Sequence, residues 1–103
     1  MQLSRTEAVR AALAAGNGVT GQLTAGVTHL PLDSGSVAIA NHGIAVKALT
    51  ANTDSVWVGI GSATTGTGTE LNPGEGVTIN IDSLTKVYVI SDTAAQKVSY
   101  ILT

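Results

Sequence analysis

The stretch LNPGEGVTINIDSLTKVYVI, residues 71–90, carries the clearest structural pattern in the chain. Its Asn72-Pro73-Gly74 segment predicts a type II turn, because proline presets φ at the second turn position and glycine supplies the positive φ of the third. Residues 77–82 then alternate apolar and polar side chains, which is typical of a half-buried strand. Residues 87–90 alternate again after a short link. The stretch therefore predicts two strands of an antiparallel β domain.

Similar short segments, separated by Gly, Asn, Asp or Pro, follow one another along most of the chain. They are residues 19–24, 27–32, 43–50, 55–60 and 97–102, with a further apolar patch at 37–39 that would add a strand or cover the core. Pro31 has no amide hydrogen to donate, so an edge position or a strand end is expected there. The polar loop 51–54 has a common hairpin length, which predicts that 43–50 and 55–60 pair as a β-hairpin.

No helix-length crossover separates these segments, which argues against a parallel sheet. We therefore expect an all-β fold: an antiparallel β-sandwich or jelly roll of about seven or eight short strands. Residues 61–69 are small and lack periodicity, so they predict a loop that is mobile or is ordered by a partner.

The first sixteen residues differ from the rest. Ser4-Arg5-Thr6-Glu7 fits a capping box, and an alanine-rich run that ends at Gly16 follows it. We expect a helical arm over 1–16 and a β-sandwich domain over 17–103. The apolar residues of the arm are Leu3, Val9 and Leu13. Because about three turns of isolated helix are marginal in water, the arm should dock, either on its own domain or on a partner.

Composition excludes several classes of function. The 103-residue chain has no cysteine, which excludes disulfides and thiolate metal sites, and its net charge of −2 with scattered basic residues argues against nucleic-acid binding. No apolar run reaches the roughly 20 residues of a membrane span. Only 12% of the residues are charged, against about 25% in an ordinary soluble domain. Interface cores are depleted in charge in the same way, so this composition favours a component of an assembly.

Catalytic chemistry is not predicted. The two histidines, His29 and His42, are isolated beside turn residues, whereas a metal site needs several converging ligands. Glu70 and Glu75 flank the proline turn, where both carboxylates should be solvated and lack the apolar pocket that a catalytic acid needs. We expect a protein that is not an enzyme, with no cofactor and no metal.

The sequence allows two environments for Trp57. It lies on the strand face opposite Val56 and Val58, so it points outward if they point inward. An outward tryptophan can anchor a partner subunit or a sugar ring. The alternative is that Trp57 is covered within its own chain.

Three segments together resemble the small head and structural proteins of tailed bacteriophages. They are KALTANTDSVWVG at 47–59, LNPGEGVTINID at 71–82 and KVYV at 86–89, and the likeness spans roughly residues 43–102, with Trp57 where the family usually has tyrosine. The resemblance implies a virion decoration (cement) protein, made in the host cytoplasm and located on the capsid exterior. Its partner would be the major capsid protein, it would often be a trimer, and it would have no catalytic residues. The 1–16 arm is outside the matched region and would be an anchoring arm.

Two functions remain open at this point. The first is capsid decoration through partner contacts. The candidate contact residues are Leu3, Arg5, Val9, Leu13, Trp57, Thr65 and Thr67. The second is a carbohydrate- or receptor-binding module of a phage tail or fibre, which would use Trp57 and the 61–69 loop.

Overall fold

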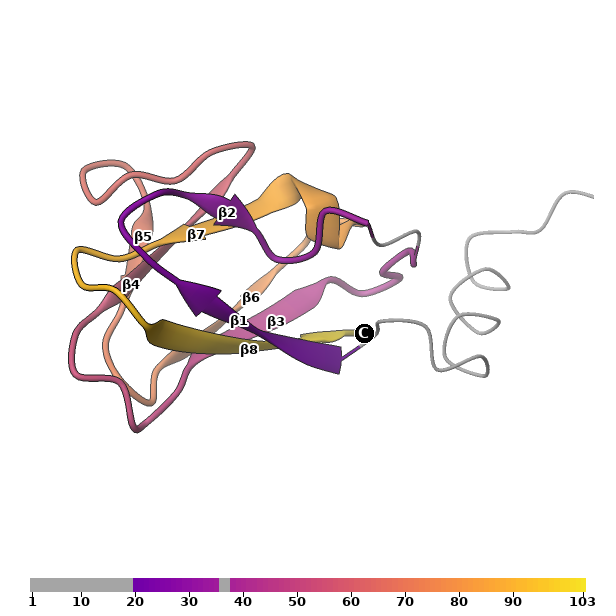
Figure 1. Cartoon of the computed structure of the whole chain (residues 1–103). Coiled ribbons are helices and arrows are strands. Elements are labelled where there is room, and N and C mark those ends of the chain that lie inside the picture. Colours follow the sequence, from indigo (N-terminus) through magenta and orange to yellow (C-terminus); the bar gives the residue numbers. More distant parts are fainter. Residues whose placement is uncertain (1–19, 36–37) are drawn as a thin grey trace, which may run out of the picture.

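The computed structural model describes residues 20–35 and 38–103, which form a sandwich of two antiparallel four-stranded sheets (Figure 1). The strands are β1 (Thr20–Ala25), β2 (Leu30–Pro31), β3 (Ile44–Ala48), β4 (Val56–Ile60), β5 (Thr69–Leu71), β6 (Gly76–Ile79), β7 (Val87–Ile90) and β8 (Gln96–Leu102). Sheet I has the order β1-β8-β3-β6, and sheet II has the order β2-β7-β4-β5. The expected sandwich is confirmed, while the helix expected over 1–16 lies outside the described residues.

Helical structure in the described part of the chain amounts to one short 3-10 turn, η1 (Leu84–Lys86). Ser83 caps it, because the Ser83 hydroxyl accepts a hydrogen bond from the Thr85 amide at 3.2 Å. Within residues 20–35 and 38–103, no helix is long and apolar enough to cross a bilayer.

Strand pairing follows one simple rule along the chain. β1 pairs with β8, β2 with β7, β3 with β6 and β4 with β5, each antiparallel. The first four strands therefore run back against the last four, as the two arms of one long hairpin would. The two further pairings, β3 with β8 and β4 with β7, join these ribbons into the two sheets.

The predicted hairpin between 43–50 and 55–60 is wrong. β3 belongs to sheet I and β4 to sheet II, so the 51–54 loop crosses from one sheet to the other. The inward residues of the two strands, such as Val46 and Val58, are 1% and 4% exposed. Both strands present an apolar face, and packing these faces against each other buries more apolar surface than placing them edge to edge would. Among the described strands, only β4 and β5 are both consecutive and paired.

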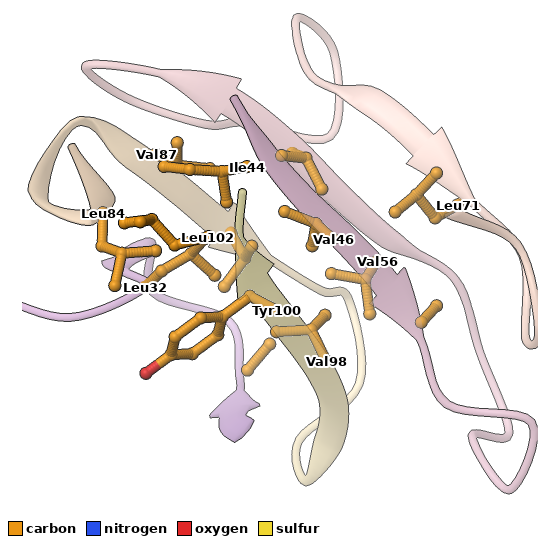
Figure 2. Close-up of a cluster of buried hydrophobic side chains, with 14 of the residues drawn as sticks. Leu32, Ile44, Val46, Val56, Leu71, Leu84, Val87, Val98, Tyr100 and Leu102 are labelled. Carbon is orange, nitrogen blue, oxygen red and sulfur yellow. The ribbon is translucent and has the colours of Figure 1, made fainter. Parts of the chain in front are cut away.

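Aliphatic side chains from both sheets fill the space between them (Figure 2). The alternation predicted for the last strand is confirmed, because Val98, Tyr100 and Leu102 are all buried. Ala38 is also buried, although residues 38–40 form no strand, so this part of the apolar patch covers the core. Gly21 lies beneath the Tyr100 ring, where a Cβ would come 2.5 Å from the phenol oxygen.

The turn that precedes β6 has the predicted form. Gly74 has a φ of +90°, and the Glu75 amide donates to the Asn72 carbonyl oxygen at 2.9 Å. The Glu75 carboxylate accepts a hydrogen bond from the Asn72 amide at 2.7 Å and so stabilises the turn. Pro31 lies in β2, an edge strand of sheet II, as its missing amide hydrogen predicted.

Candidate functional site

Trp57 lies on the outer face of sheet II. Its neighbours Val56 and Val58 point into the core, and Trp57 is half-buried. Its cross-strand partners are Glu70 in β5 and Ile90 in β7. The outward direction predicted for Trp57 is therefore found, but part of its surface is covered within the chain.

The loop between β4 and β5 provides part of this cover. A Cβ at Gly68 would lie 2.8 Å from the Trp57 Cβ, which places the end of the loop against the tryptophan. A Cβ at Gly59 would meet the Ser62 carbonyl oxygen, so the start of the loop folds back onto β4. Only glycine at these two positions allows the loop to approach the sheet so closely.

The same face carries a small aromatic pair. The His29 and Tyr88 rings have centroids 5.0 Å apart, and His29 Nδ1 accepts from the Ala63 amide at 3.3 Å. Ala63 is only 1% exposed, so its hydrogen bond to His29 helps to fix the β4–β5 loop against sheet II. His29 therefore has a structural partner in its own chain. The other histidine, His42, lies in a separate turn beside Asn41.

Thr65 and Thr67 are both exposed at the tip of this loop. The Thr67 hydroxyl lies 2.7 Å from the Thr64 hydroxyl, and the Gly68 amide donates to the Thr64 carbonyl oxygen at 2.8 Å. The loop is thus closed by hydrogen bonds of its own. Thr65 and Thr67 therefore lie in the same loop that contacts Trp57 at Gly68. The other candidate contact residues, Leu3, Arg5, Val9 and Leu13, lie outside the described residues.

A shallow groove on the outer face of sheet I was not anticipated from the sequence. Its volume is about 440 Å³, and it runs over β1, β8, β3 and β6. Ile101 in β8 lines it and is 47% exposed, with Ala45 opposite it in β3. The outward residues of these four strands are uncharged apart from Lys47 and Lys97. Strand alternation places each of these side chains on the outer face of its own strand. Only the order of the strands in sheet I brings them together into one groove.

Asp54 and Tyr100 are two ionisable groups whose surroundings shift the pKa. Asp54 accepts from the Thr93 hydroxyl and the Ser55 amide, both at 2.7 Å, and these hydrogen bonds lower the pKa of its carboxyl. Burial, and then the charge of Asp33, raises the pKa of the Tyr100 phenol. Glu70, the middle residue of β5, is exposed as predicted.

In the part of the chain that the structure describes, no three His, Cys, Asp or Glu side chains gather in a group that could hold a metal ion. Comparison with protein-family models, curated proteins and solved structures finds no match to this chain.

Proposed function

We propose that this chain is a non-enzymatic virion structural protein, a decoration protein that binds the outer surface of a tailed-phage capsid and stabilises the contacts between capsomers. The strand pairing carries the proposal. A long hairpin of four strand pairs, rolled into two four-stranded sheets, is interpreted as a jelly roll. Viral capsid and lectin domains use this architecture, and the phage-like segments at 47–59, 71–82 and 86–89 favour the first of these.

The outer face of sheet I is the surface that we assign to the capsid. It is broad, carries the exposed Ile101 and has Lys47 and Lys97 as its only charged residues. A surface with few charges loses little solvation when it is covered, so modest apolar contacts can give net binding. Many copies on one shell add avidity, and the phage resemblance favours a homo-oligomer with a trimer as the expected form.

Binding to shells that lack the protein tests the proposal. We expect saturable co-sedimentation of the wild-type chain with such shells. Ile101→Lys should weaken binding at least roughly tenfold, because a charge would be buried in an apolar contact. Ile60→Lys is the matched control, since Ile60 is 54% exposed at the end of β4 in the other sheet. Absence of binding by the wild-type chain would contradict the proposal.

The second candidate, a carbohydrate-binding module, is favoured by one observation. Trp57 and Tyr88 both lie half-buried on the outer face of sheet II, where aromatic rings can stack on a sugar. Selective binding on a glycan array that is lost in Trp57→Ala, with shell binding absent, would place this function above capsid decoration.

A further inference from the structure

The four edge strands of the sandwich differ in how well they are protected from pairing with another chain. β2 has two residues and contains Pro31, and β5 has three residues and contains Glu70. β6 has four residues and begins at Gly76, directly after Glu75. Short length, proline and charge are the usual means by which sheets block their edges. Three of the four described edges therefore carry at least one such feature.

β1 has none of these features. It is six residues long, with the sequence TGQLTA, and has neither charge nor proline. One of its edges pairs with β8 along the whole strand, and no described residue pairs with the other edge. Each unpaired edge presents a row of backbone donors and acceptors that a further strand can use.

Apolar side chains lie beside this edge. Leu23 of β1 and Leu30 of β2 line one groove of about 340 Å³ between the two sheets. Leu30 is 40% exposed, and Val27 in the β1–β2 connection is 67% exposed. Leu23 points inward, like its cross-strand partner Val98, but it is only half-buried because β1 is the last strand of its sheet.

We propose that β1 is a self-association edge, on which a second copy of this chain pairs its own β1 in antiparallel orientation about a two-fold axis at Leu23. In this register Leu23 lies against Leu23 of the second copy, and Gln22 lies opposite Thr24 of the second copy. Gly21 then faces Ala25 of the second copy. The pairing does not depend on capsid binding.

The choice of a second copy rests on self-complementarity. An antiparallel pair of β1 strands places neutral residues opposite one another throughout, so no like charges on β1 come into contact. It also buries the half-exposed Leu23 of both copies. Five paired residues and a few aliphatic side chains are a small interface, so we expect a weak dimer that forms at tens of micromolar, roughly. If the free protein is a monomer, the two-fold pairing predicts a dimer. If it is a trimer, the pairing predicts a hexamer made of two trimers.

Single-cysteine variants test the register, because the natural chain contains no cysteine. Residues directly opposite in an antiparallel pair have Cα atoms roughly 4.5–5.5 Å apart, within the range that a disulfide spans. A mixture of Gln22→Cys and Thr24→Cys chains should therefore form disulfide-linked dimers at least about fivefold faster than either variant alone, whose cysteines would be diagonal neighbours roughly 7–8 Å apart. Thr78→Cys is the control, since Thr78 is exposed on β6, the opposite edge of sheet I.

Mass measurement across a concentration series tests the association itself. As the concentration rises, the mass of the wild-type protein should change from that of a monomer to that of a dimer, or from that of a trimer to that of a hexamer. Leu23→Lys should abolish the change, because an inward-pointing lysine blocks an edge strand. Val77→Lys, a half-buried inward position on β6, should not. A chain that stays a monomer or a simple trimer up to about 500 µM, or a cysteine mixture that links no faster than Thr78→Cys, would overturn the proposal.

Discussion

At the scale of single residues, Gly43 shows how one position can require glycine for two reasons at once. Its φ is +119°, which L side chains rarely adopt, and a Cβ there would lie 2.5 Å from the Ile79 carbonyl oxygen. The Gly43 carbonyl oxygen also accepts from the Thr103 amide at 2.9 Å. The start of β3 is therefore fixed by a residue without a side chain.

Gly43→Ala should lower the free energy of unfolding by about 2–4 kcal/mol, through backbone strain and the contact with Ile79. Gly26→Ala is the control, because nothing lies within 4 Å of a Cβ at Gly26 and its φ is not in the positive range. That variant should stay within about 0.5 kcal/mol of the natural chain. Urea denaturation of both variants measures the difference, and equal stabilities would contradict the assignment.

At the scale of elements, the 51–54 loop depends on β8 for its conformation. The side-chain amide of Gln96, which is 4% exposed, accepts from the Thr53 amide at 2.9 Å and from the Asp54 amide at 3.0 Å. The same amide donates to the Thr53 hydroxyl and to the Ala94 carbonyl oxygen, both at 3.2 Å. Asn52 adds two hydrogen bonds with the Lys97 backbone, each at 2.8 Å. A loop of hairpin length is thus held as a connection between the two sheets.

Gln96→Ala should reduce the free energy of unfolding by about 2 kcal/mol, because four hydrogen bonds are lost and the loop amides lose their acceptor. Asn80→Ala, which removes an exposed side-chain amide just after β6, should cost less than about 0.5 kcal/mol. Hydrogen exchange should also show faster exchange of the Thr53 and Asp54 amides in the Gln96 variant. Unchanged protection of these amides would show that Gln96 does not hold the loop.

At the scale of the whole molecule, Asp54 and Thr93 join two chain segments that both cross between the sheets. Asp54 lies between β3 and β4, and Thr93 lies between β7 and β8. The Thr93 hydroxyl and the Ser55 amide lower the pKa of Asp54 below its ordinary value of 3.8. A lowered folded-state pKa means that the folded state binds this proton less tightly than the unfolded chain does.

The stabilisation from Asp54 should therefore be present above the ordinary pKa of 3.8 and be lost as the pH falls through the lower folded-state pKa. Asp54→Asn should be less stable than the natural chain near neutral pH, and this difference should shrink in acid. Thr93→Val should move the Asp54 pKa back toward its ordinary value, as read by carboxyl-carbon NMR titration. An Asp54 pKa that is unchanged in Thr93→Val would contradict this account.

The sequence alone determined the local features of this protein. Alternation located β3, β4, β6, β7 and β8 to within a few residues and showed which side chains share a face, because a strand has a period of two. The NPG turn followed from the fixed φ of proline and the freedom of glycine. The outward direction of Trp57 followed from the same alternation. These features depend on residues that are neighbours in the sequence, so they can be inferred from the sequence.

Only the tertiary structure decided which strands pair. The 51–54 loop has a length that suits both a hairpin and a crossing between sheets, and the structure shows the crossing because β3 and β4 belong to different sheets. The sheet order pairs Ile101 with Ala45 over the sheet I groove and places β1 at an edge with which no described residue pairs. The β4–β5 loop lies beside Trp57. The pairing of Ile101 with Ala45 joins residues far apart in the sequence, where periodicity carries no information about contact.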